Sequence, residues 1–102
     1  MDERRRKGLL GICVRAGQAA FGEDNCRKAA VKGTCELVLV DSGVSGNTRK
    51  RYETLCHGTG TKLVFLPEGL LEAATGKEYM AMAILKGSLL DQVLNCLRQD
   101  NA

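Results

Sequence analysis

The sequence contains no tryptophan and only one proline, two tyrosines and two phenylalanines among its 102 residues. Its core must therefore be built from Leu, Val, Ile, Ala and Cys rather than from aromatic side chains. Hydrophobic residues still make up 44% of the chain, which excludes a disordered protein. A chain of this length fits one domain, residues 1–102, and can bury enough apolar surface to fold without a metal ion or a disulfide.

Long apolar runs are also missing. No stretch is long enough to cross a membrane, and we expect no signal peptide, so the sequence predicts a cytoplasmic protein with no membrane partner. The formal charge of +3 is mildly basic, which permits a nucleic-acid partner but does not require one. Much of the excess lies in the run Arg-Arg-Arg-Lys at residues 4–7, which is typical of a solvated first helical turn.

The five cysteines are widely spaced, with none within three residues of another. A zinc knuckle needs closer pairs, and a closed disulfide framework needs an even number. All five lie in or beside apolar positions of periodic segments. We therefore expect small, buried, reduced side chains and no metal or other cofactor. They are Cys13, Cys26, Cys35, Cys56 and Cys96.

Catalytic motifs are weak as well. Cys56 and His57 are adjacent, but neighbours on a helix point in different directions, so they do not form a nucleophile and its base. The segment 69–77 lacks the GxxxxGK[ST] spacing of a phosphate loop, and Glu78 stands where Ser or Thr would bind magnesium. The acids are scattered, with no pair spaced for general acid/base work. We therefore expect a protein that is not an enzyme.

Helical and extended patterns alternate in the first half of the chain. Residues 3–16 have helical spacing, and Gly17 is a typical left-handed C-cap. After a short extended link, Gly22 opens a second helix that Gly33 ends. The apolar run 36–41 is typical of a strand covered on both faces. The expected inward side chains are Leu9, Ile12, Cys13 and Ala16 in the first helix, and Cys26, Ala29 and Ala30 in the second.

The alternation continues in the second half. Ser45 or Asn47 can cap a third helix with Tyr52 on its inner face, and Pro67 suits the first turn of a fourth helix. Helices alternating with short apolar strands predict an α/β domain with helices on both faces of a sheet. The expected elements are a third helix broken by residues 57–61, a strand over 62–66, a helix from 67 to about 75, a strand over 79–85, and a helix over 87–98 with Leu90, Val93, Leu94 and Leu97 facing inward.

The segment 21–28 combines a glycine, a helix start, polar side chains and a lysine one turn later. A glycine lets an RNA backbone approach closely, and free amides at a helix start can meet phosphate or base acceptors. An amide side chain offers a donor and an acceptor to a base edge, and a carboxylate accepts from guanine amino and imino groups. Lysines can neutralise phosphate. An ordinary helix cap with acidic first-turn residues explains the same pattern. The candidate RNA-binding residues are Gly22, Glu23, Asp24, Asn25, Lys28 and Lys32.

Several short motifs follow one another between about Lys7 and Leu85. They are Arg15-Ala16-Gly17-Gln18, Phe21-Gly22-Glu23 with Lys28, the strand 36–41, Ser45-Gly46-Asn47-Thr48-Arg49-Lys50, Leu55-Cys56, and the segment 70–78 from Leu70 to Glu78. In order and spacing, these motifs resemble the L-seven-Ae/L-thirty-e ribosomal protein superfamily, and within it the short bacterial members.

This resemblance implies a three-layer α/β/α sandwich around a mixed four-stranded sheet. It also implies a monomeric, ribosome- or translation-associated protein that binds structured RNA, such as ribosomal RNA with a kink-turn-like internal loop. In the family, the start of the second helix contacts tandem sheared G·A pairs, and a lysine one turn later contacts RNA. By resemblance, these contacts correspond here to Gly22, Glu23, Asp24, Asn25 and Lys28. A second contact, from the loop before the last strand, corresponds to Lys77, Glu78 and Tyr79.

The sequence departs from the family's strongest kink-turn binders in two places. Those proteins carry Asn then Glu after the glycine, whereas this chain has Asp24 then Asn25 in altered order. Their late loop is small and apolar, whereas this one has Lys77 and Glu78. An alternative function is therefore a protein–protein interaction module that keeps this fold and has lost RNA binding.

Overall fold

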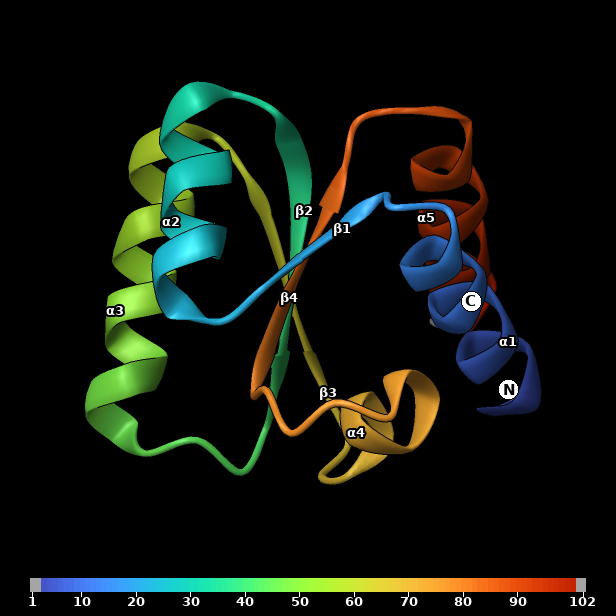
Figure 1. Ribbon diagram of the computed structural model, residues 1–102. Helices are drawn as coiled ribbons and strands as arrows, with labels where there is room; N and C mark the ends of the chain where they lie inside the picture. Colours follow the sequence, from blue (N-terminus) through green and yellow to red (C-terminus); the bar gives the residue numbers. More distant parts are fainter. Residues whose placement is uncertain (1–2, 101–102) are drawn as a thin grey trace.

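The computed structural model describes residues 3–100, which form a four-stranded sheet between two layers of helices (Figure 1). The helices are α1 (Glu3–Arg15), α2 (Glu23–Lys32), α3 (Gly46–Thr59), α4 (Leu70–Thr75) and α5 (Ser88–Asp100), and the strands are β1 (Ala19–Phe21), β2 (Cys35–Asp41), β3 (Lys62–Leu66) and β4 (Ala81–Leu85). Helices α2 and α3 cover one face of the sheet, and α1, α4 and α5 cover the other. The predicted three-layer α/β/α sandwich is confirmed. No helix within residues 3–100 is long and apolar enough to span a bilayer.

The sheet is mixed, with strand order β1-β4-β2-β3. Strand β4 is antiparallel to both β1 and β2, whereas β2 and β3 are parallel. The ends of β1, β2 and β3 and the start of β4 therefore lie at one end of the sheet. The starts of α2 and α3 follow β1 and β2 at this same end, as Figure 1 shows. The topology thus gathers the candidate RNA-binding segments of the sequence at one end of the molecule.

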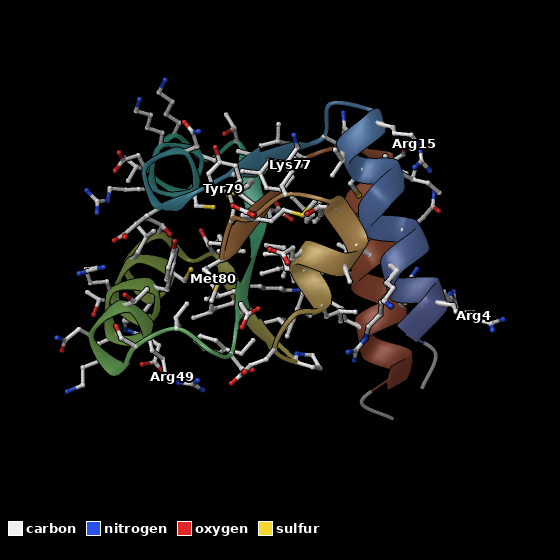
Figure 2. All side chains as sticks on the ribbon, turned by 60° about the horizontal axis from the view of Figure 1, so that its bottom comes forward. Arg4, Arg15, Arg49, Lys77, Tyr79 and Met80 are labelled. Carbon is white, nitrogen blue, oxygen red and sulfur yellow. The ribbon has the colours of Figure 1, made fainter. Side chains whose placement is uncertain are left out.

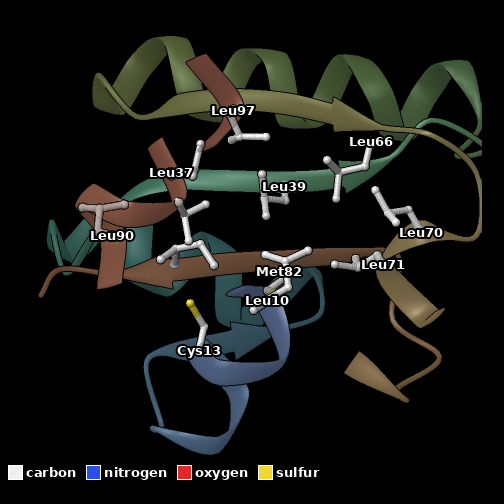
Figure 3. Packing of buried hydrophobic residues seen from close by; sticks show 12 residues of the cluster. Leu10, Cys13, Leu37, Leu39, Leu66, Leu70, Leu71, Met82, Leu90 and Leu97 are labelled. Carbon is white, nitrogen blue, oxygen red and sulfur yellow. The ribbon is translucent and has the colours of Figure 1, made fainter. Parts of the chain in front are cut away.

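Side chains of different size cover the two faces of the sheet. The face toward α1, α4 and α5 is built mainly from leucines (Figure 3), and burying each such side chain contributes about 1.5–3 kcal/mol. The layer between the sheet and helices α2 and α3 is built mainly from small residues, with Tyr52 as the exception, and small residues let these helices lie close to the strands. The buried residues of this second face are Cys26, Ala29, Ala30, Cys35, Val38, Val40, Tyr52, Cys56, Ala81 and Ala83.

All five cysteines are buried and carry free thiols. Each has less than 4% of its surface exposed, although the five lie on different elements: Cys13 on α1, Cys26 on α2, Cys35 on β2, Cys56 on α3 and Cys96 on α5. Cys26 Sγ makes a weak hydrogen bond of 3.8 Å to the carbonyl oxygen of Ala20. The prediction that the cysteines act as small core residues is therefore confirmed.

The buried stripe of α1 differs from the predicted one. Leu10 and Cys13 are buried and Val14 is partly buried, whereas Ile12 is 41% exposed and Ala16 is exposed. The inward stripe is therefore shifted around the helix by about one residue. The helical period fits both stripes, and the choice between them depends on how α1 packs against α4 and α5.

The predicted end of the third helix was wrong. Residue His57 does not break it, because α3 continues to Thr59, and Gly60 follows in a left-handed conformation with φ of 71°. The amide of Thr61 then donates to the carbonyl of Cys56 at 2.9 Å, which closes the helix. A glycine in a helix interior costs only about 1 kcal/mol. This cost is too small to end α3 at Gly58, because the burial of Cys56 stabilises the last turns of the helix. At the other end of α3, Ser45 rather than Asn47 is the cap, because its side chain accepts from the amide of Thr48 at 3.2 Å.

Two more predicted starts were placed too early. Pro67 does not begin the fourth helix but lies in a turn after β3, where its carbonyl accepts from the amide of Leu70 at 3.1 Å. Strand β4 begins at Ala81 rather than at residue 79, because Tyr79 and Met80 belong to the preceding loop. Both side chains are largely exposed, which a central strand of this sandwich would not allow.

Candidate nucleic-acid interface

The corner between β1 and α2 is fixed by Gly22. Its φ of 86° and ψ of 163° lie in a region that only glycine adopts readily. Its amide donates to the carbonyl of Ala81 at 3.1 Å, and its own carbonyl accepts from the amide of Cys26 at 3.0 Å. Gly22 therefore joins the start of β4 to the first turn of α2.

The loop between α4 and β4 packs against this corner. The Tyr79 ring stacks on the Phe21 ring, with centroids 5.6 Å apart and planes inclined by 26°. The Lys77 Nζ atom lies over the same Phe21 ring, 5.6 Å from its centroid. Figure 2 shows Lys77, Tyr79 and Met80 together between the two helical layers. The structure thus brings together the two segments that the resemblance indicated as separate RNA contacts.

A groove of about 450 Å³ opens beside Tyr79, and we call it the Tyr79 groove. It is lined by Gly22, Glu23, Val44, Ser45, Thr48, Tyr52, Glu78, Tyr79, Met80 and Ala81. A hollow of about 370 Å³ is lined by Phe21, Gly22, Glu23, Asp24, Asn25 and Tyr79. Tyr79, with 51% of its surface exposed, lines both spaces. Met80 and the start of α3 were not among the predicted site residues. The cap signal at Ser45 indicates a helix start in the sequence, but no local pattern indicates that this start lies beside Tyr79.

The carboxylate of Glu23 is held by arginines. Arg51 of α3 donates to both of its oxygens from one guanidinium edge, at 2.8 Å for Nε to Oε1 and 3.2 Å for Nη2 to Oε2. The same Nη2 donates to the Thr48 hydroxyl at 3.2 Å, and Arg27 lies 3.7 Å from Glu23. This bidentate pair joins the first turn of α2 to the second turn of α3. It also offsets negative charge at the rim of the Tyr79 groove.

The remaining predicted residues of α2 take different positions. Asn25 turns back on the corner, where its Nδ2 donates to the carbonyl of Phe21 at 3.0 Å. Asp24 and Lys28 are exposed within the first two turns of the helix. Lys32 is exposed in the last turn, roughly 13 Å along the axis from Glu23 at 1.5 Å per residue. The structure therefore does not bring Lys32 to the Tyr79 groove.

Two loops at the same end of the molecule are tied together by Asp41. This side chain is only 6% exposed, and its Oδ1 and Oδ2 accept from the amides of Gly43 and Gly69 at 2.7 and 3.0 Å. The amide of Asp41 in turn donates to the carbonyl of Met80 at 2.8 Å. Asp41 thus links the segment before α3, the turn before α4 and the loop before β4.

The thiols are poorly suited to chemistry at neutral pH. Burial, with Cys35 and Cys56 nearby, raises the pKa of Cys26 to about 12. Burial and the nearby Cys35 raise the pKa of Cys56 to about 11. Cys56 is buried while the adjacent His57 is exposed, so the two side chains point apart. Across the described residues, His, Cys, Asp and Glu side chains form no group of three that could hold a metal ion.

No protein-family model and no curated protein sequence matches the chain. Solved structures, in contrast, share its fold. A protein of unknown function from Bacillus halodurans C superposes with a TM-score of 0.83 at 23% identity, covering 91% of this chain and 96% of that chain. The 15.5kD RNA binding protein of Giardia lamblia superposes with a TM-score of 0.74 at 16% identity, covering 95% of this chain and 84% of that chain. The chain therefore has a fold that an RNA-binding protein also uses.

Proposed function

We propose that this protein binds structured RNA at the Tyr79 groove, through the start of α2 and the loop before β4. The observation that carries the proposal is the packing of Tyr79 on Phe21 beside Gly22, which joins both segments into one exposed surface. The shared fold of the Giardia lamblia RNA binding protein supports it. The order of motifs in the sequence, which resembles that of the L-seven-Ae/L-thirty-e ribosomal protein superfamily, also supports it.

The chemistry of the groove favours bases over phosphates. Glu23 and Glu78 line it, and carboxylates repel phosphate but accept hydrogen bonds from guanine amino and imino groups. The half-exposed Tyr79 ring offers a surface on which an unstacked base can pack, an interaction of about 1–3 kcal/mol. Base edges are hidden in the deep groove of an A-form duplex and accessible in internal loops. We therefore infer that the ligand is an RNA duplex with an internal loop, such as a kink-turn, in ribosomal or other translation-associated RNA.

The test is a gel-shift titration with two RNAs of equal length: a duplex interrupted by a kink-turn internal loop, and an uninterrupted duplex. Wild type should prefer the interrupted RNA, and binding should weaken steeply between low and moderate salt because phosphate contacts release counterions. Lys28→Ala should weaken binding roughly three- to tenfold and reduce the salt slope by about one, because it removes one phosphate contact. Tyr79→Ala should lower the affinity for the interrupted RNA far more than for the duplex.

Lys62→Ala is the matched control. Lys62 is exposed at the start of β3, opposite Leu37, and therefore lies at the other end of the sheet from the groove. It changes the net charge as Lys28→Ala does and should leave binding unchanged. Equal affinity of wild type for both RNAs would remove the internal-loop specificity. Failure to bind either RNA would remove the proposed function and leave a protein partner, for which the exposed pair Tyr79 and Met80 is a suitable contact.

A further inference from the structure

Helices α2 and α3 carry an excess of basic residues. Helices α2 and α3 together contain six basic residues and three acidic ones, so their formal charge equals the +3 of the whole chain. The rest of the chain sums to zero, although α1 alone has five basic residues and one acidic one. The six basic residues are Arg27, Lys28, Lys32, Arg49, Lys50 and Arg51.

A groove of about 350 Å³ lies between these two helices, and we call it the α2–α3 groove. Arg27 lines it from α2, and Lys50, Arg51, Thr54 and Leu55 line it from α3. The side chains of Arg27 and Arg51 are 56% and 57% exposed, and Lys50 is exposed as well. The groove therefore presents three cationic groups and a hydroxyl above a half-buried leucine. Such a surface complements an anionic polymer better than an apolar ligand.

The α2–α3 groove and the Tyr79 groove share a rim. Glu23 lines the Tyr79 groove and Arg51 lines the α2–α3 groove, and the two side chains form the 2.8 Å ion pair between α2 and α3. Arg51 also donates to Thr48, which lines the Tyr79 groove. A chain that leaves the Tyr79 groove across this ion pair therefore enters the α2–α3 groove.

The two grooves have opposite chemistry. The Tyr79 groove carries carboxylates and an aromatic ring, so it suits bases and leaves the phosphates of a bound RNA without a partner. The neighbouring groove offers cations and no carboxylate among its lining residues. We propose that the α2–α3 groove binds the phosphates of the RNA strand that continues from the element held in the Tyr79 groove. This inference rests on the proposed RNA-binding function and adds a second, sequence-independent contact to it.

The test uses the double variant Arg27→Gln/Lys50→Gln, which removes two charges and keeps polar side chains. The control Lys62→Gln/Lys86→Gln removes the same charge at the start of β3 and just after β4, the end of the sheet away from both grooves. Lys86 lies 3.7 Å from Glu36 in an exposed pair, so its loss should affect stability little. Arg51 is left intact because its loss would also free Glu23.

The probes are the interrupted duplex RNA and the uninterrupted duplex RNA of equal length. Because phosphates are common to both, the groove variant should weaken both by the same factor, roughly tenfold at about 0.1 M salt, and lower each salt slope by about two. The preference for the interrupted RNA should stay unchanged. The control variant should behave like wild type.

The outcomes separate this inference from the proposed function. Suppose that Tyr79→Ala abolishes the preference for the interrupted RNA but Arg27→Gln/Lys50→Gln binds like wild type. The internal-loop site at the Tyr79 groove is then supported, and the phosphate contact at the α2–α3 groove is overturned. If wild type shows no preference but the groove variant still weakens duplex binding, the phosphate contact stands and the internal-loop site falls. If wild type binds neither RNA, both fall, and an acidic protein segment becomes the partner to examine at the α2–α3 groove.

Discussion

At the scale of single residues, Gly22 determines the position of the α2 start. Its φ of 86° and ψ of 163° would strain any other residue, while a Cβ added there would lie 3.5 Å from the Tyr79 ring, an ordinary contact. Gly22→Ala should therefore lower the free energy of unfolding by about 1–3 kcal/mol through backbone strain rather than through a clash. Urea unfolding followed by circular dichroism measures this change.

Gly58→Ala is the control for Gly22→Ala. Gly58 lies inside α3, and a Cβ added there would meet no atom within 4 Å. The substitution should raise the free energy of unfolding by about 0.5–1 kcal/mol, because alanine favours a helix interior and glycine does not. If both variants destabilised the protein equally, the special backbone of Gly22 would not be the cause.

Buried thiols should make the protein sensitive to alkaline pH. The folded-state pKa values of about 12 for Cys26 and about 11 for Cys56 lie above the ordinary value of 9.0, to which both return on unfolding. Below pH 9 both states are protonated and the thiols cause no pH dependence. Above pH 9 the unfolded chain binds fewer protons, so the free energy of unfolding should fall by about 1.4 kcal/mol per pH unit for each thiol.

Urea unfolding in the presence of a reductant, at intervals from neutral pH to about pH 10.5, tests this slope. Cys26→Ala should be less stable at neutral pH, because it leaves a cavity, but its stability should fall less steeply above pH 9. Burial also raises the pKa of Tyr52, which adds to the loss from about pH 10 upward. A free energy of unfolding that stays constant through pH 10 would contradict the prediction.

At the scale of elements, Asp41 holds three connecting segments together at the end of the sheet. Asp41→Ala would remove the acceptors that lie 2.7 and 3.0 Å from the amides of Gly43 and Gly69. It should cost about 1.5–3 kcal/mol of stability, because hydrogen bonds to a charged group contribute more than those between neutral groups. Amide hydrogen exchange at Gly43 and Gly69 should accelerate well beyond the change caused by lower global stability.

Two variants sharpen this prediction. Asp41→Asn keeps one acceptor oxygen, so it should lose less stability than Asp41→Ala and protect only one of the two amides. Ser42→Ala changes the exposed neighbour and should leave both exchange rates as in wild type. Fast exchange at both amides in the wild-type protein would show that the Asp41 hydrogen bonds do not hold these segments in solution.

The periodic elements could be predicted from the sequence because local patterns determine them. The buried run of β2, the Ala and Cys stripe of α2 and the glycine after it are all visible in consecutive residues. The ends of helices and strands that depend on tertiary contacts were harder to predict from the sequence. Gly58 stays helical because Cys56 is anchored in the core, and Tyr79 leaves the strand because its ring packs on Phe21.

The candidate site shows the same division. Gly22 and the acidic first turn of α2 are recognisable in the sequence, and the structure places the late loop beside them. The pair between Glu23 and Arg51 joins residues 28 positions apart, and no local spacing indicates it. The α2–α3 groove likewise depends on the fold, because α2 and α3 follow β1 and β2 and pack side by side on one face of the sheet.

At the scale of the whole molecule, the two helical layers should respond differently to RNA. Helices α2 and α3 line both grooves, whereas α1, α4 and α5 cover the other face of the sheet. Figure 2 places Arg4 and Arg15 of α1 apart from the loop of Tyr79. We therefore expect bound RNA to cover one end and one face, and to leave the layer of α1 and α5 uncovered.

Titration of isotopically labelled protein with the interrupted duplex RNA, followed by amide chemical shifts, tests this arrangement. The shifts of Gly22, Tyr79 and Lys50 should change most, because RNA covers the two grooves they represent, and those of Leu10 and Val93 should stay constant as the internal control. With the uninterrupted duplex, Lys50 should still respond, since phosphates alone suffice there, while Tyr79 should respond weakly. Changes in residues 4–7 as large as those of Tyr79 would contradict a one-sided surface and would extend the RNA contact to the basic turn of α1.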